Sequence, residues 1–126
     1  MTAVRTTRAP APKGAYSQGR TAAGLLFVAG QAPFDAHGNM VGKTIAEQTR
    51  ATLENVKAIV EAAGATLADV VKVNVYLTDL ANFGAMNEVY ASFFPDPYPA
   101  RTTVQAGLLG FLVEIDAVVE LPTSKR

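Results

Sequence analysis

The chain has 126 residues, of which 49% are hydrophobic, and its eleven basic side chains are balanced by eleven acidic ones. This length supports one domain over residues 1–126, and because the basic residues are scattered we expect no nucleic-acid partner. The lack of cysteine excludes thiolate sites, the single His37 excludes a polyhistidine metal cage, and no run approaches the ~20 apolar residues that cross a membrane.

The first forty residues predict loops around two short strands. Residues 8–15 contain two prolines and a glycine, which deny them regular structure. Residues 16–20 and 25–30 are typical of two strands joined by a turn at 23–24. Residues 33–42 form another loop.

A helix is predicted between Thr44 and Gly64. Thr44 and Glu47 have the spacing of a capping box, in which each side chain accepts a hydrogen bond from an orphan backbone N–H group. Gly64 is typical of the left-handed residue just past a helix end. Apolar residues recur every 3.6 positions between these ends, at Ile45, Leu53, Val56, Ile59, Val60 and Ala63.

The second half of the chain predicts a strand, a helix and two further strands. Residues 70–77 alternate between two faces, as in a half-buried strand. One face is expected to carry Val71, Val73, Val75 and Leu77, and the other Lys72, Asn74 and Tyr76. A second helix over about 82–94 ends before three prolines, and strands follow at about 100–106 and 112–120.

This order of elements predicts an α+β fold with one mixed sheet. Each helix links strands far enough apart to be parallel neighbours, and right-handed crossovers place both helices on one face of the sheet. The other face would stay uncovered and is partly apolar. The connection at 107–113 is apolar as well, which is typical of a partner surface. We therefore expect the open sheet face to be buried against other copies of the chain.

Two charged residues near the C-terminus indicate a chemical role. Arg101 lies at the start of the strand 100–106, and its guanidinium fork matches a substrate carboxylate. Glu114 shares one face of the last strand with Asp116, points away from the helices and could move protons in a sheltered cleft. Both could instead be solvated strand residues, and composition alone favours this alternative for Arg101. No metal or nucleotide motif competes with the pair.

Seven tracts in order along nearly the whole chain carry a recognisable pattern. They are Lys-Gly-Ala-Tyr-Ser-Gln-Gly (13–19), Phe-Val-Ala-Gly-Gln-Ala-Pro (27–33), Asn-Val-Lys-Ala-Ile-Val-Glu-Ala-Ala-Gly (55–64), Val-Asn-Val-Tyr-Leu-Thr-Asp-Leu (73–80), Met-Asn-Glu-Val-Tyr-Ala-Ser-Phe-Phe (86–94), Pro-Ala-Arg-Thr-Thr-Val (99–104) and Val-Glu-Ile-Asp-Ala (113–117). The chain resembles the Rid (reactive intermediate deaminase, YjgF-like) superfamily, and most closely its RidA-type branch. The resemblance implies a chorismate-mutase-like homotrimer with a central β-barrel and clefts between subunits.

The resemblance also implies which residues form the site. Arg101 corresponds to the arginine that binds the substrate carboxylate, and Glu114 to the glutamate that positions or activates the attacking water. Tyr16 would line the cleft from a neighbouring subunit. The other implied residues are Asn87 on the second helix, Thr103 through its main-chain carbonyl, and the wall formed by Ala29, Gly30 and Gln31. Two residues depart from the pattern, because Ala29 replaces a usual serine and Ala15 a usual proline.

The implied activity is cofactor-free hydrolysis of small 2-imino or enamino acids, such as 2-iminobutanoate and 2-iminopropanoate, to 2-oxo acids and ammonia. Such an enzyme would need no metal, and its partners would be a small acid and two further copies of the chain, with neither nucleic acid nor membrane. The alternative is a non-catalytic trimer that binds a ligand or a protein, for which Ala29 is the best support. A ribonuclease or translation inhibitor finds less support, because the chain has no basic stripe and no histidine pair. The lack of cysteine agrees with a cytoplasmic location.

Overall fold

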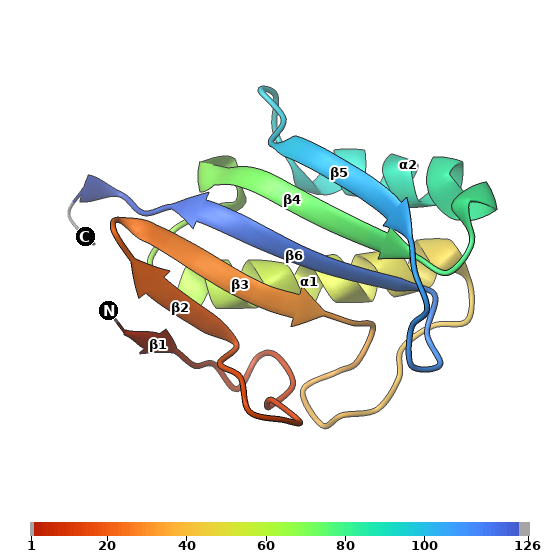
Figure 1. Ribbon diagram of the computed structural model, residues 1–126, viewed down its shortest axis with the longest axis horizontal. Coiled ribbons are helices and arrows are strands. Elements are labelled where there is room, and N and C mark those ends of the chain that lie inside the picture. Colours follow the sequence, from red (N-terminus) through yellow and green to blue (C-terminus); the bar gives the residue numbers. More distant parts are fainter. Residues whose placement is uncertain (1, 124–126) are drawn as a thin grey trace.

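Two helices cover one face of a six-stranded sheet in the computed structural model, which describes residues 2–123 (Figure 1). The strands are β1 (Ala3–Val4), β2 (Gly19–Ala22), β3 (Leu25–Gln31), β4 (Val70–Leu77), β5 (Ala100–Gln105) and β6 (Val113–Glu120). The helices are α1 (Ile45–Ala62) and α2 (Phe83–Phe93), with short 3₁₀ turns at Leu67–Asp69 and Leu80–Asn82. The predicted α+β class, with both helices on one side of a mixed sheet, is confirmed. Neither helix of the described chain is long and apolar enough to cross a membrane.

The order of the strands in the sheet is β1-β2-β3-β6-β4-β5. Strands β4 and β5 are parallel, and the other neighbouring pairs are antiparallel. The prediction that each helix connects parallel neighbours is therefore right for α2 and wrong for α1. The last strand, β6, returns between β3 and β4 and separates them. Its outward side chains consequently lie in the middle of the uncovered face.

The N-terminal strands differ from the prediction in where they begin and in their number. Residues 16–18 precede β2, and the unpredicted strand β1 pairs with β2. The buried Gln18 accepts a hydrogen bond from the Thr6 N–H group at 2.8 Å and donates one to the Pro10 carbonyl at 2.9 Å. One amide thus holds the segment before β2 against residues 6–10.

Helix α1 begins and ends where the sequence predicts. The Glu47 N–H group donates to Thr44 Oγ1 at 3.2 Å, and the Glu47 carboxylate accepts from the Thr44 N–H group at 3.1 Å. Gly64 follows with a φ of 85°, in the left-handed region. The helix packs its apolar stripe on the sheet, and the fully buried side chains include Leu26, Leu53, Val56, Ile59, Val73, Val75, Val113 and Ile115.

Strand β4 occupies the predicted residues but changes face at its start. Its register with β6 shifts between Val70 and Lys72, which marks a bulge. Val70 is consequently 5% exposed and Val71 46% exposed, so the prediction that Val71 shares the face of the later valines is wrong. The other three predicted members of that face, Val73, Val75 and Leu77, are fully buried.

Candidate active site

Helix α2 holds Arg101 from one side. The Arg101 Nη1 atom donates to Asn87 Oδ1 at 2.8 Å. The guanidinium carbon lies 4.5 Å from the centre of the Tyr90 ring and 5.2 Å from that of Phe83, within the range of cation–π attraction. Asn87 and Tyr90 are three residues apart on α2 and therefore share one face of the helix. The hydrogen bond to Asn87 uses one of the five guanidinium N–H donors, which leaves a fork for a ligand.

Open space lies next to this fork. A cavity of about 330 Å³ is lined by Asn87, Tyr90, Ala91, Tyr98, Pro99 and Arg101. Among residues 2–123, no carboxylate lies within ion-pair distance of the Arg101 guanidinium. A positioned guanidinium with no counter-ion, beside a cavity, is suited to bind a carboxylate.

Tyr90 supports Arg101 through its ring. Its hydroxyl is buried and has no hydrogen-bond partner in the part of the chain that the structure describes. Burial raises the pKa of Tyr90 to about 12, although the charge of Arg101 acts in the opposite direction. Tyr90 therefore stays neutral and offers Arg101 the face of an aromatic ring. This role was not predicted from the sequence, although the spacing of three residues from Asn87 was a usable signal.

Glu114 occupies a second cavity, of about 320 Å³, on the open face of the sheet. Gly30 on β3 makes room for it, since a methyl group at Gly30 would lie 2.5 Å from Glu114 Oε2. Burial raises the pKa of the Glu114 carboxyl, and the charge of Asp116 raises it further. A carboxyl whose pKa is shifted toward neutrality can both accept and return a proton.

The second cavity gathers four of the predicted residues, namely Tyr16, Gly30, Gln31 and Glu114. Tyr16 is 52% exposed, and its hydroxyl accepts a hydrogen bond from the Lys13 N–H group at 3.3 Å. Ala29, next to Gly30 on β3, offers a methyl group and a carbonyl, and the carbonyl accepts from Gln31 Nε2 at 3.1 Å. Other residues line this cavity without having been predicted from the sequence, among them Lys13, Phe34, Leu109 and Phe111.

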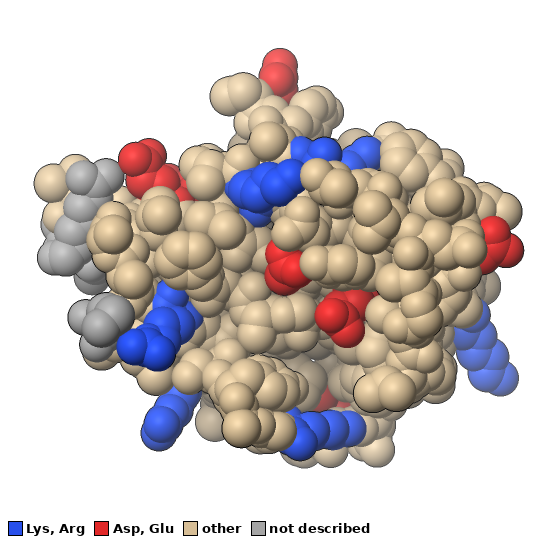
Figure 2. Space-filling model, in the orientation of Figure 1, with Lys and Arg blue, Asp and Glu red and all other residues tan. Residues whose placement is uncertain are grey.

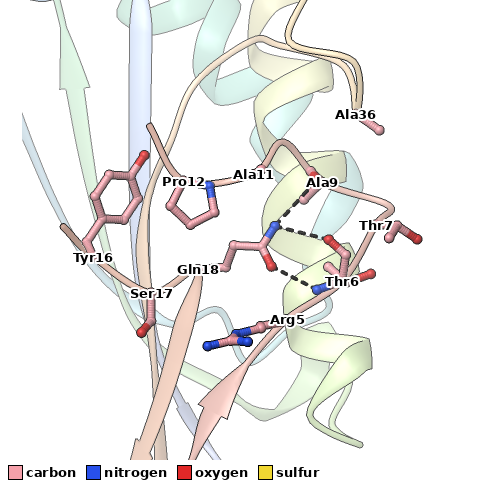
Figure 3. Close-up of a pocket in the computed structure, with 10 residues that line it drawn as sticks. All are labelled: Arg5, Thr6, Thr7, Ala9, Ala11, Pro12, Tyr16, Ser17, Gln18 and Ala36. Carbon is pink, nitrogen blue, oxygen red and sulfur yellow. Dashed lines mark hydrogen bonds between the residues drawn. The ribbon is translucent and has the colours of Figure 1, made fainter. Parts of the chain in front are cut away.

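A third cavity, of about 590 Å³, lies beside the N-terminal segment (Figure 3). Gln18 stands at its centre and is already hydrogen-bonded to the backbone of Thr6, Ala9 and Pro10. Tyr16 borders both this cavity and the one that contains Glu114. We therefore interpret the third cavity as a hollow beside the loop that carries Tyr16, and not as a separate candidate site.

The predicted residues form two groups on opposite faces of the sheet. Arg101 pairs with the buried Val73 in the parallel ladder, so its side chain is on the helix face. Thr103 pairs with Val75 and shares that face. Glu114 pairs with Tyr76 on the uncovered face, which Figure 2 shows as mostly uncharged, with acidic side chains near its middle. One chain therefore does not bring Arg101 and Glu114 together.

This α+β fold, with Arg101 beside a cavity on one face of the sheet and Glu114 beside a cavity on the other, defines a class of small proteins that is already known. The sequence model of the family described as Endoribonuclease L-PSP matches residues 6–121. The RutC family protein PH0854 of Pyrococcus horikoshii is 50% identical over 116 residues, which are 90% of this chain and 92% of the relative. The chain thus belongs to the Endoribonuclease L-PSP family, that of the YjgF and Rid proteins.

Solved structures agree in fold over nearly the full length. RidA from the Antarctic bacterium Psychrobacter sp. PAMC 21119 is 40% identical, with a TM-score of 0.91 over 96% of this chain and 100% of that one. TdcF of E. coli, solved with bound serine, is 38% identical, with a TM-score of 0.90 over 97% of this chain and 100% of that one.

Proposed function

We propose that this protein is a cofactor-free hydrolase that deaminates small 2-imino acids, of the 2-iminobutanoate and 2-iminopropanoate type, to 2-oxo acids and ammonia. The observation that carries the proposal is the Arg101 fork, which lies beside a cavity without a counter-ion in the described chain. All of these substrates have a carboxylate that the fork would bind. Family membership supports imine or enamine deamination in general, and the serine bound to TdcF is a small acid of comparable size.

We place the site between the protomers of a homotrimer. Arg101 and Glu114 lie on opposite faces of one sheet, so a second copy has to supply one of them. The uncovered face also carries exposed apolar side chains, among them Phe27 at 45% and Val104 at 41% exposure. In the proposed trimer, these faces would pack into a central β-barrel and remove that surface from water.

Each residue would have one role in the reaction. Arg101, steadied by Asn87 and Tyr90, would hold the substrate carboxylate and orient the imine carbon. Tyr16 would line the cleft from the neighbouring protomer, and Gly30 and Gln31 its wall. The Thr103 carbonyl, two residues along β5 from Arg101, would hold the imine nitrogen or the water. These contacts order a substrate that is already electrophilic at its C=N carbon.

Glu114 would carry the proton. It would take one proton from water as the water oxygen bonds to the carbon of the protonated imine, and would return it to the nitrogen, which becomes an ammonium group. The C–N bond then breaks, ammonia leaves with the bonding electron pair, and loss of the hydroxyl proton forms the C=O group of the 2-oxo acid. Because imines hydrolyse readily in water, orientation and one proton carrier would suffice.

One observation favours a second candidate, a trimer that binds a ligand without useful turnover. Ala29 gives the site no hydroxyl at the position where the RidA-type pattern has a serine. In this alternative the Arg101 fork would still bind a small acid such as a 2-oxo acid. The test below separates binding from turnover. The cytoplasmic location and the lack of nucleic-acid and membrane partners stay predictions.

The proposal is tested by generating 2-iminobutanoate in place with an amino-acid oxidase and catalase, and by following its decay. We expect the wild type to accelerate the decay and Arg101→Ala to lose nearly all of that activity while it stays folded and assembled. Arg8→Ala is the matched control, because Arg8 lies in an exposed ion pair with Glu61 at 3.0 Å. A wild type that only binds 2-oxobutanoate would favour the second candidate, and full turnover by Arg101→Ala would contradict the assigned site.

A further inference from the structure

Asp116 occupies a fixed position on the open face, two residues after Glu114 on β6. Its Oδ1 atom accepts a hydrogen bond from Asn74 Nδ2 at 3.0 Å, and its Oδ2 atom accepts one from the Tyr76 hydroxyl at 3.0 Å. In the ladder between β4 and β6, Asn74 stands opposite Asp116 and Tyr76 stands opposite Glu114. The two donors, both on β4, fix the orientation of the Asp116 carboxylate.

The Tyr76 hydroxyl keeps the proton that it donates to Asp116. Burial raises the pKa of its phenol, and the hydrogen bond to Asp116 raises it further. The phenol therefore keeps its proton at neutral pH and continues to donate to Asp116. The amide of Asn74 does not titrate, so both supports of the Asp116 carboxylate persist across the working pH range.

Few other charges face Glu114. On β3 its neighbours are Gly30 and Gln31, which carry none. The loop before β2 brings Tyr16 and Lys13 to the same cavity, and the Lys13 ammonium lies 4.7 Å from the centre of the Phe34 ring. Farther along the open face, Lys72 Nζ donates to Thr102 Oγ1 at 2.7 Å. Asp116 is thus the charge that β6 itself places beside Glu114, and it raises the pKa of that carboxyl in addition to the effect of burial.

We propose that Asp116 is a positioning residue that acts on the reaction through Glu114, because the negative charge held by Asn74 and Tyr76 keeps the Glu114 carboxyl able to take and return a proton. Asp116 is not among the residues that line the cavity beside Glu114, so its role is argued through Glu114. Two carboxylates on one face of a strand repel each other, and this repulsion raises the pKa of Glu114 beyond the effect of burial. The catalytic part of this inference rests on the proposed function, whereas the electrostatic coupling does not.

The coupling can be measured without substrate by carbon-13 NMR of the side-chain carboxyl carbons of labelled Glu and Asp. Glu114→Gln identifies the Glu114 signal by its loss. We expect Asp116→Asn to lower the titration midpoint of Glu114, because the repelling charge is removed. Glu54→Gln, which removes an exposed charge from α1 on the other side of the sheet, should leave the midpoint unchanged. An unchanged midpoint in Asp116→Asn overturns the inference.

The wild type provides a second readout that does not depend on the folding of a variant. Coupled carboxyls report each other's titration, so the Asp116 carbon should show a second inflection at the midpoint of Glu114. This inflection should vanish in Glu114→Gln. Its absence from the wild type would equally overturn the inference.

Activity separates this inference from the function on which it rests. If the wild type hydrolyses 2-iminobutanoate, Asp116→Asn should move the acid limb of kcat/KM to lower pH, by the same amount as the NMR midpoint. A wild type without activity contradicts the proposed function and leaves the NMR result standing. An active wild type whose acid limb is unmoved in Asp116→Asn contradicts the role of Asp116 and leaves the proposed function standing.

Discussion

Arg101 and Glu114 lie on opposite faces of the same sheet, although the proposed reaction needs both. Arg101 pairs in register with Val73, which is buried beneath the helices, and Glu114 pairs with Tyr76 on the uncovered face. Side chains on opposite faces of a strand pair point away from each other. The two groups can therefore meet only at a boundary between protomers, and this relationship leads to a direct test.

Mixing two inactive variants should restore activity. Arg101→Ala and Glu114→Gln each remove one group, but in a mixed trimer an intact Arg101 can face an intact Glu114 of its neighbour. If an equimolar mixture is unfolded and refolded together, random assembly leaves about a quarter of the boundaries intact. We expect roughly this fraction of wild-type kcat in the imine assay.

The control for this experiment is each variant refolded alone, which should stay inactive. A co-refolded mixture that is as inactive as its components would place both groups in the site of a single protomer. That result would contradict the intersubunit site, while the assignment of Arg101 to the substrate carboxylate would be tested separately.

Gly30→Ala should displace Glu114. The added methyl group would lie 2.5 Å from Glu114 Oε2 and 3.0 Å from its carboxyl carbon, so the side chain has to move. Misplacing a catalytic group by about 1 Å can cost 10²-fold, and we expect kcat to fall about 10- to 100-fold. Gly84→Ala is the control, because a methyl group there has no atom of the described chain within 4 Å apart from the backbone of its own helix and its two chain neighbours. Wild-type kcat in Gly30→Ala would show that Glu114 does not act from this position.

The ring of Tyr90 should matter and its hydroxyl should not. Tyr90→Leu removes the face on which the Arg101 guanidinium lies, so we expect KM to rise about tenfold as the fork loses its fixed position. Tyr90→Phe keeps the ring and removes a hydroxyl that has no partner among residues 2–123. This variant should keep wild-type kinetics and a free energy of unfolding within about 1 kcal/mol of wild type. Equal kinetics in the two variants would contradict the supporting role of the ring.

Glu114→Gln should stabilise the fold at neutral pH. The pKa of Glu114 is raised above its ordinary value of 4.5 in the folded state, so the folded protein binds its proton more tightly than the unfolded chain does. The stability that this proton contributes is present below pH 4.5 and is lost as the pH rises through the raised pKa. We therefore expect thermal unfolding of Glu114→Gln at pH 7 to occur roughly a few degrees higher than wild type.

The difference between Glu114→Gln and wild type should shrink as the pH falls below 4.5, where both side chains are neutral. Glu54→Gln, at an exposed position, is the control and should show little change at either pH. A Glu114→Gln protein that is less stable than wild type at pH 7 would indicate that the ionised carboxylate has a partner that supports it.

The sequence predicted those parts of the fold that depend on neighbouring residues. The capping box of Thr44 and Glu47 and the left-handed Gly64 fix the ends of α1 through local hydrogen bonds and backbone conformation. The order of the strands was not predicted, because the alternation within β6 does not specify that it lies between β3 and β4. Val71 was misplaced for a similar reason, since a bulge against a distant strand breaks the alternation.

The candidate site was likewise predicted only in part from the sequence. Resemblance supplied Arg101 and Asn87, and the structure joins them by a hydrogen bond. Tyr90 was predicted only as part of an apolar helix face. In the structure its ring lies against the Arg101 guanidinium. The partners of Asp116 could not be predicted, because Asn74 and Tyr76 are about forty residues away and meet it only across the ladder.

Strand β5 ends the sheet, so one side of its backbone has no neighbouring strand among residues 2–123. An unpaired strand border invites unwanted association with other chains, and this border carries the same arginine that the proposed chemistry requires. Docking of a second copy would cover this edge of the sheet and would complete the proposed active site. A variant that weakens this docking should therefore lose both activity and solubility. Precipitation would then be an early sign that the catalytic site no longer assembles.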